Sequence, residues 1–198
     1  MDVHKIDVHK IGIKYFLSSG ADVDADTWFR IFNTWIPVTT DEILIDVADY
    51  SHVHNGPVTL LVGHNSNYGI DRGEGRLGLL TTRKQPLEGG FEDRFRTCLG
   101  GALKACARLE NEADLKDRAH FDCSMLQVVL NDRLNAPNTA ETLKAVKPGV
   151  ESALQQIYTG ADLSIEHRDT SGSLFALDIT VSGDWNIDKL MKNMPISA

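Results

Sequence analysis

The segment 42–84 constrains the fold most, because its residue pattern predicts strands joined by tight turns. Apolar runs lie on both sides of Asn55-Gly56, and an Asn-Gly pair in that setting is the strongest short-range signal for a β-hairpin. A further strand is expected over 76–83, after a glycine-rich turn. Such short turns join antiparallel neighbours, whereas parallel strands need a long crossover connection. The segment therefore predicts an antiparallel meander.

Helical periodicity appears before and after this meander, and it does not alternate strictly with strands as it would in a doubly wound sheet. We therefore predict an α+β fold, with an antiparallel or mixed β-sheet meander and helices packed on one face. Helices are expected over 26–36, 91–109, 138–157 and near the C-terminus, and the remaining strands over 10–17, 123–131 and 161–181.

Two glycine-containing pairs predict special features within these helices. Gly100-Gly101 in the middle of the second one costs about 2 kcal/mol relative to two alanines, which predicts a close approach of another element, most simply the sheet. Pro148-Gly149 is expected to break or kink the third helix.

A chain of 198 residues can bury enough surface to fold without disulfides or a structural metal. We predict a single α+β domain over residues 1–198, with a candidate subdomain seam near 110–120, where the segment 110–118 is densely charged. The N-terminal tract repeats itself, Asp2 to Ile6 recurring as Asp7 to Ile11. We interpret it as a small duplication at a frayed terminus whose second copy leads into a strand.

Composition excludes several classes of function. The net charge of −8 opposes binding to a phosphate backbone, so we expect no nucleic-acid partner. No apolar run is long enough to span a membrane, and we expect no membrane partner. Cys98, Cys106 and Cys123 have neither disulfide nor zinc spacing, which favours free thiols and a cytoplasmic location.

No cofactor or metal is predicted. Gly73, Gly75 and Gly78 match a dinucleotide-binding pattern by letter, but that pattern must open a helix, and here a strand follows. These glycines are interpreted as a turn. A three-histidine metal site is likewise not expected, because the predicted hairpin turns His64 to the face opposite His52.

The predicted hairpin yields two candidate catalytic residues. With Asn55-Gly56 as a two-residue loop, Asp49 and His64 are diagonal neighbours on the core face, close enough for a hydrogen bond. Such a pair is either structural or an oriented general base. The lack of a matched serine or cysteine nucleophile favours the structural interpretation.

The opposite hairpin face yields ligand-binding candidates. There Ala48 is predicted to pair with Gly63. Because both residues are small, this part of the sheet face is expected to form a shallow depression. A polar loop over 65–69 lies beside it. A half-solvated sheet face is the alternative to a pocket. The candidate ligand-binding residues are Asp46, Tyr50, Asn65, Tyr68 and Arg76.

Charge is unevenly distributed along the chain. The segment 70–108 holds eight basic and five acidic residues, a net charge of +3, which leaves −11 for the remainder. A basic segment of this kind suits a small polar or anionic ligand, or an acidic patch on a second subunit. The first hypothesis is small-molecule binding, or an enzyme of unassigned reaction class, with a polar site on the 42–68 hairpin. The second is a non-catalytic homodimeric interaction protein that uses the basic 70–108 segment.

Overall fold

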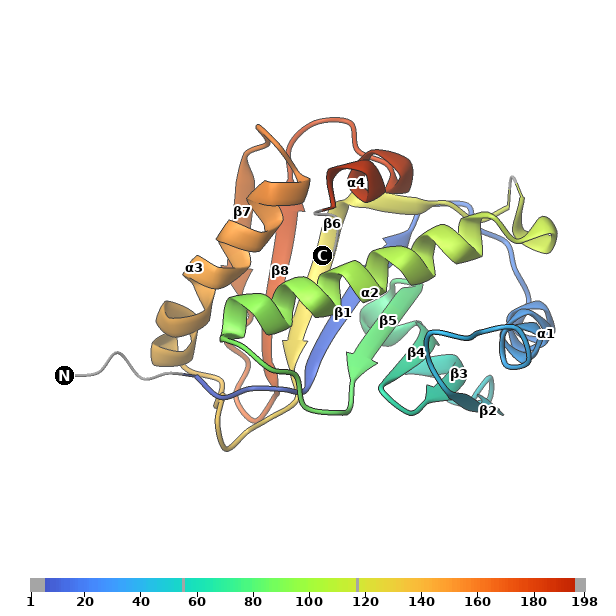
Figure 1. The fold of residues 1–198 in the computed structure, drawn as a ribbon, viewed down its shortest axis with the longest axis horizontal. Coiled ribbons are helices and arrows are strands. Elements are labelled where there is room, and N and C mark those ends of the chain that lie inside the picture. The colour runs from blue at the N-terminus through green and yellow to red at the C-terminus, as the bar shows by residue number, and fades with distance from the viewer. Residues whose placement is uncertain (1–5, 55, 117, 195–198) are drawn as a thin grey trace.

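The computed structural model describes residues 6–54, 56–116 and 118–194. Eight antiparallel strands form one sheet in the order β2-β3-β4-β5-β1-β6-β8-β7, and helices pack against it, so the predicted α+β fold is confirmed (Figure 1). The elements are β1 (Ile11–Leu17), α1 (Ala25–Trp35), β2 (Leu44–Asp49), β3 (Pro57–Gly63), β4 (Ser66–Asp71), β5 (Gly78–Arg83), α2 (Phe91–Glu110), β6 (Phe121–Leu130), α3 (Ala140–Ile157), β7 (Leu163–His167), β8 (Phe175–Val181) and α4 (Ile187–Asn193). Two short 3-10 turns, Gly73–Gly75 and Ala113–Leu115, complete the described chain.

Strand β1 joins the two halves of the sheet. It pairs with β5 on one side and with β6 on the other, so that Ile13 lies opposite Thr81 and Val128. All seven of its residues are buried. The β2–β5 meander and the β6–β8–β7 group are therefore held in one sheet through the N-terminal strand.

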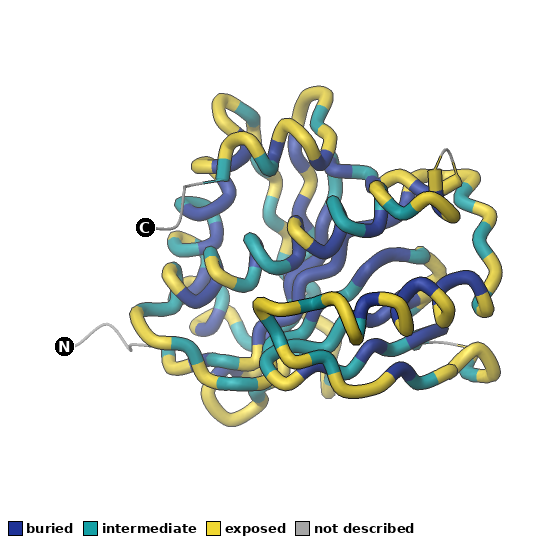
Figure 2. Tube along the Cα trace, turned by 45° about the vertical axis from the view of Figure 1, so that its right-hand side comes forward, coloured by how far each residue is buried: buried dark blue, intermediate teal, exposed yellow. Residues whose placement is uncertain are grey.

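The helices cover one face of this sheet. Helix α2 crosses in front of β1 and β5, α3 and α4 lie beside it, and α1 packs on β2 and β3 (Figures 1 and 2). Apolar side chains that point toward the helices fill the core. Buried residues, dark blue in Figure 2, gather at the centre of the molecule, between the sheet and the helices. They include Ile13, Tyr15, Leu61, Leu79, Val128, Leu177, Trp28, Phe32, Phe95, Leu103 and Leu154.

The opposite face of β1 carries a buried charge. Lys14 is 2% exposed, and its Nζ lies 2.6 Å from Asp71 Oδ1 and 3.2 Å from the Gly73 carbonyl oxygen. Gly78 permits this arrangement, because a Cβ there would lie 2.3 Å from the Tyr15 carbonyl oxygen and 3.1 Å from Lys14 Cε. The glycine-rich segment is thus a turn followed by strand β5, as predicted, and it covers the lysine.

The meander differs from the prediction in two ways. First, the chain turns at Asp49, whose carboxylate accepts a hydrogen bond from the Ser51 N–H, and β3 resumes only at Pro57. The predicted two-residue loop and its register are therefore wrong: Val47 pairs with Leu61, and Ala48 pairs with Leu60 rather than with Gly63. Second, the expected polar loop over 65–69 belongs mostly to strand β4.

Two helix predictions also need correction. Helix α3 continues through Pro148 without a break. Gly149 lies against α2, where an added Cβ would be 3.2 Å from Phe91. The Gly100-Gly101 pair of α2 does not face the sheet: a Cβ at Gly100 would meet Met194 at 3.7 Å, and a Cβ at Gly101 would meet nothing within 4 Å.

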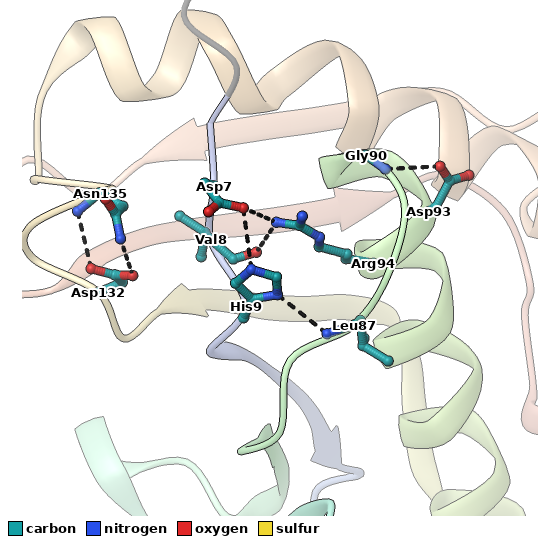
Figure 3. Close-up of polar contacts among 9 residues, drawn as sticks. All are labelled: Asp7, Val8, His9, Leu87, Gly90, Asp93, Arg94, Asp132 and Asn135. Carbon is teal, nitrogen blue, oxygen red and sulfur yellow. Dashed lines mark hydrogen bonds and ion pairs between the residues drawn. The ribbon is translucent and has the colours of Figure 1, made fainter.

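The second copy of the N-terminal repeat leads into β1, as predicted, and contacts of Asp7 and His9 hold it against the start of α2 (Figure 3). Arg94 at the start of α2 donates from Nη1 to Asp7 Oδ1 at 2.7 Å, and the Leu87 N–H donates to Nδ1 of His9. His9 Nε2 lies 3.1 Å from Asp7 Oδ1. Most of the first copy, residues 2–5, lies outside the described residues.

Within the described chain, no helix combines the length and apolar character that a membrane crossing requires.

Replacing Lys14 by Met tests the buried ion pair. The substitution leaves the Asp71 carboxylate buried without its cation, which we expect to lower the free energy of unfolding by about 3–5 kcal/mol. Urea unfolding followed by circular dichroism measures it. Lys144→Met on the exposed side of α3 is the control and should change stability by less than about 0.5 kcal/mol. A Lys14→Met protein as stable as this control contradicts the role of the pair.

Candidate functional site

A cavity of about 570 Å³ lies beside α2, above the β4–β5 part of the sheet. One wall comes from the end of α1 and the segment that follows it, and the floor comes from β4 and β5. Residues of α3 and Met194 line the other side of α2. The lining that carries the argument is Trp35, Thr39, Asp41, Glu42, Leu44, Asn65, Ser66, Tyr68, Arg83, Cys98, Gly101, Leu103, Lys104 and Arg108.

The Glu42 carboxylate fixes the β3–β4 turn at the cavity wall. Its Oε1 accepts hydrogen bonds from the backbone N–H groups of Asn65 and Ser66, at 3.0 and 2.7 Å. Its Oε2 accepts a short hydrogen bond from the Tyr68 hydroxyl. The close approach needs Gly63, because a Cβ there would lie 2.8 Å from Glu42 Oε1. Glu42 therefore serves the fold, and both of its oxygens are occupied.

The same contacts hold Tyr68 in its neutral form. Burial is the largest cause that raises the pKa of Tyr68 well above its usual value, and the hydrogen bond to Glu42 adds to it. At neutral pH the phenol is a hydrogen-bond donor whose proton is directed at Glu42. Tyr68 thus contributes a neutral, ordered ring to the cavity floor.

Three cationic side chains give the cavity its charge. The Arg108 guanidinium lies 4.1 Å from the Trp35 ring, and its Nη1 donates to Thr39 Oγ1 at 2.7 Å. Arg83 donates from Nε to the Gln85 carbonyl oxygen, and its terminal nitrogens bind no group in the described chain. Lys104 Nζ likewise has no partner among the described residues. Free donors therefore remain on Arg83 and Lys104.

Other charged groups at the cavity are already used or exposed. Arg96 donates to Glu92 and Asp93, so its charge is neutralised on α2 itself. Asp41 is exposed, and it raises the pKa of Arg108 against the stronger opposing effect of burial. With Asp41 counted against Arg83, Lys104 and Arg108, the remaining charge of the cavity lining is positive.

Cys98 lies on the wall that α2 presents to Arg83. Burial raises the pKa of its thiol to about 12, although the nearby Arg83 lowers it somewhat. At neutral pH the sulfur is therefore protonated and a weak nucleophile. The geometry gives no support for thiol catalysis at this place.

The structure brings together only part of the predicted ligand site. Asn65 and Tyr68 line the cavity, but Asp46 and Tyr50 do not, and both are exposed on or beside the edge strand β2. Arg76 lies on the other face of the sheet, where its guanidinium is 4.2 Å from the Phe16 ring. The predicted set therefore does not form one site, because the register that grouped it is incorrect.

The predicted pair of Asp49 and His64 does not form. Asp49 pairs with Thr59 across the ladder, and its carboxylate accepts from the Ser51 N–H, the main cause of its lowered pKa. His64 is exposed and donates its backbone N–H to the Ile43 carbonyl oxygen at the other end of β2. Neither residue can orient the other.

The sequence reasoning missed the residues that build the cavity. Arg83, Lys104 and Arg108 all belong to the basic 70–108 segment, so the signal existed as local charge. The sequence did not show that the end of β5 and one side of α2 lie next to each other. Glu42 gave no signal, because two of its partners are backbone N–H groups, which no residue pattern marks.

Two further observations bear on what the site can be. Among the described residues, no three His, Cys, Asp or Glu side chains gather as a metal site would require. Comparison with known proteins gives no match: no family model, no curated protein and no solved structure matches the chain. The function must therefore be argued from the cavity.

The raised pKa of Tyr68 predicts a pH dependence of stability. Because the folded pKa exceeds the unfolded value, this group's contribution is fully present below about pH 10 and is lost as the pH rises above it. Stability should therefore fall less steeply between pH 9.5 and about 11.5 in Tyr68→Phe than in the wild type, as measured by urea unfolding. Tyr50→Phe, which removes an exposed hydroxyl, is the control. Identical slopes for Tyr68→Phe and the wild type would contradict the contact with Glu42.

Proposed function

We propose that the protein binds a small anionic molecule, with a carboxylate or phosphate group, in the cavity between α1, α2 and the β4–β5 part of the sheet. The observation that carries the proposal is that Arg83 and Lys104 line this cavity with donors that no described residue satisfies. Arg83 is half-buried and gains most from an anionic ligand, because charge-assisted hydrogen bonds are stronger away from bulk water. Lys104 is exposed and adds a second positive charge.

The three cations suit different parts of such a ligand. Arg83 offers a planar pair of nitrogens that fits a carboxylate or phosphate in two-point contact. Arg108 is held against Trp35 and Thr39, so little side-chain entropy is lost when it binds. Lys104 is an exposed point charge at the rim. Together they support recognition of one or two negative charges.

The size and remaining lining point to a metabolite rather than a bare ion. A volume of about 570 Å³ lies within the usual range of small-molecule sites, roughly 300–1,000 Å³. Leu44, Leu103 and the Trp35 ring supply apolar surface for a carbon body, and Asn65 adds a neutral polar group. Binding is the function that these residues support, because the cavity thiol is protonated and the predicted general-base pair is absent.

We also propose a cytoplasmic location for this activity. Its support is that Cys98, Cys106 and Cys123 are all free thiols, which suits a reducing compartment.

A thermal-shift screen tests the proposal, with inorganic phosphate, succinate, citrate and a nucleoside monophosphate as probes. An anion at about 100 times its Kd should stabilise the fold by about 2.7 kcal/mol and raise Tm by roughly 5–10 °C. Calorimetric titration of the best probe gives its Kd, and Arg83→Gln and Lys104→Gln should each weaken it about tenfold or more.

Lys144→Gln is the matched control, because it removes an exposed cation of α3 that does not line the cavity. Its Kd should equal that of the wild type. The proposal is overturned if no anion in the panel binds at millimolar concentration, or if the control weakens binding as much as Arg83→Gln does.

A further inference from the structure

The cavity reaches both sides of helix α2. Its lining comes from β4, β5 and the segment after α1 on one side, and from α3 and the residue that follows α4 on the other. Helices α3 and α4 pack against one side of α2, and α1 lies on the other side (Figure 1). Thr97 and Lys104, which are exposed on the outer surface of α2, belong to the same lining. The cavity is therefore a trough that crosses the outer surface of α2.

Gly100 and Gly101 make this crossing possible. Thr97 and Lys104 lie about 10 Å apart along the helix axis, at a rise of about 1.5 Å per residue, and the glycine pair lies between them. Among the described residues, an added Cβ at Gly101 would meet nothing within 4 Å, and one at Gly100 would meet only Met194, at 3.7 Å. The outer surface of α2 is thus lowest where the cavity crosses it.

The end of the trough beside β5 is cationic. Arg83 lies close enough to Cys98 for its charge to lower the pKa of that thiol, against the larger effect of burial. Cys98, Gly101 and Lys104 follow one another at intervals of three residues, so they are neighbours on the surface of the helix. The charges of Arg83 and Lys104 therefore lie on either side of Gly101, and both residues line the cavity.

The end of the trough beyond the helix offers no unpaired charge. Arg96 is the charged lining residue on this side, and its guanidinium is bound to Glu92 at 2.6 Å and to Asp93 at 3.2 Å. The other lining residues here include Ala153, Gln156, Ile157 and Met194. A second negative group would find no unpaired cation at this end, whereas an aliphatic chain would contact the flexible side chain of Met194.

We propose that the ligand of this cavity is a monocarboxylate with an unbranched aliphatic chain of about eight or more carbons, which lies across α2 over Gly100 and Gly101. This ligand class rests on the proposed function and adds a shape to it. A helix with its side chains is about 10–12 Å across. A chain that advances about 1.3 Å per carbon, with bonds of about 1.5 Å, needs about eight carbons to cross it. The carboxylate binds Arg83 and Lys104, and the chain ends against Met194.

Calorimetric titration with straight-chain carboxylates of four, six, eight and ten carbons tests the chain length. A fully buried CH₂ group lowers Kd about fourfold, and a half-buried one about twofold. Octanoate should therefore bind at least tenfold more tightly than butanoate. The readout is the ratio of these two Kd values in the same protein.

Gly101→Leu puts a side chain into the crossing and should reduce this ratio to about threefold or less. Gln155→Leu is the matched control, because Gln155 is exposed on α3 and does not line the cavity, and it should keep the wild-type ratio. Circular dichroism checks that each variant is folded. If Gly101→Leu is not, Gly101→Ala replaces it, since alanine suits a helix interior, and should at least halve the ratio.

Two results overturn the proposed ligand shape. One is a wild-type protein that binds butanoate and octanoate equally well or binds neither. The other is a ratio that the Gly101 substitution leaves unchanged, because the chain then lies elsewhere. Binding of phosphate, succinate and citrate, and its loss in Arg83→Gln, is measured separately. The anion site can therefore stand when the chain-binding trough fails, and its own failure is recognised by the absence of binding to every anion.

Discussion

The pairing of β1 with strands on both of its sides is the constraint on which the rest of the structure depends. The β2–β5 meander comes before α2 in the chain, and β6, β7 and β8 come after it. Only β1, which precedes both groups, lies between them. A strand in that position is buried on two faces, and one of its residues is a lysine. Asp71 neutralises that lysine from the end of β4, so the buried charge of the central strand is compensated only when the meander has formed beside it.

The cavity lies where the helices cover the sheet incompletely. Helix α2 packs over β1 and β5, and α1 packs over β2 and β3, which leaves the region above β4 less fully covered. Glu42 secures the turn at this place by binding two backbone donors and one phenol. The Glu42 carboxylate of the cavity lining is thereby occupied, and the cations of α2 and β5 give the lining most of its remaining charge.

The fold class was predictable because it depends on local patterns. Asp24 caps α1 as a helix-start residue should, and Trp28, Phe32 and Trp35 follow at helical spacing and are buried. Register was not predictable from Asn55-Gly56, because the competing turn at Asp49 and the proline at the start of β3 moved the loop. Strand β4 was missed because Ser66 and Asn67 are typical of loops, and only its two neighbours make it a strand. The site was not predictable because Arg83 and Arg108 meet only through tertiary packing.

The glycine pair of α2 affects both the stability of this helix and the shape of its surface. At Gly101 neither the backbone conformation nor a neighbouring atom demands glycine, because an added methyl group would touch nothing within 4 Å. Alanine there would strengthen the helix by about 1 kcal/mol. A chain optimised for stability alone would fill this position. What glycine preserves is volume beside the cavity, so the helix is weaker at one of the positions where its surface lines that cavity.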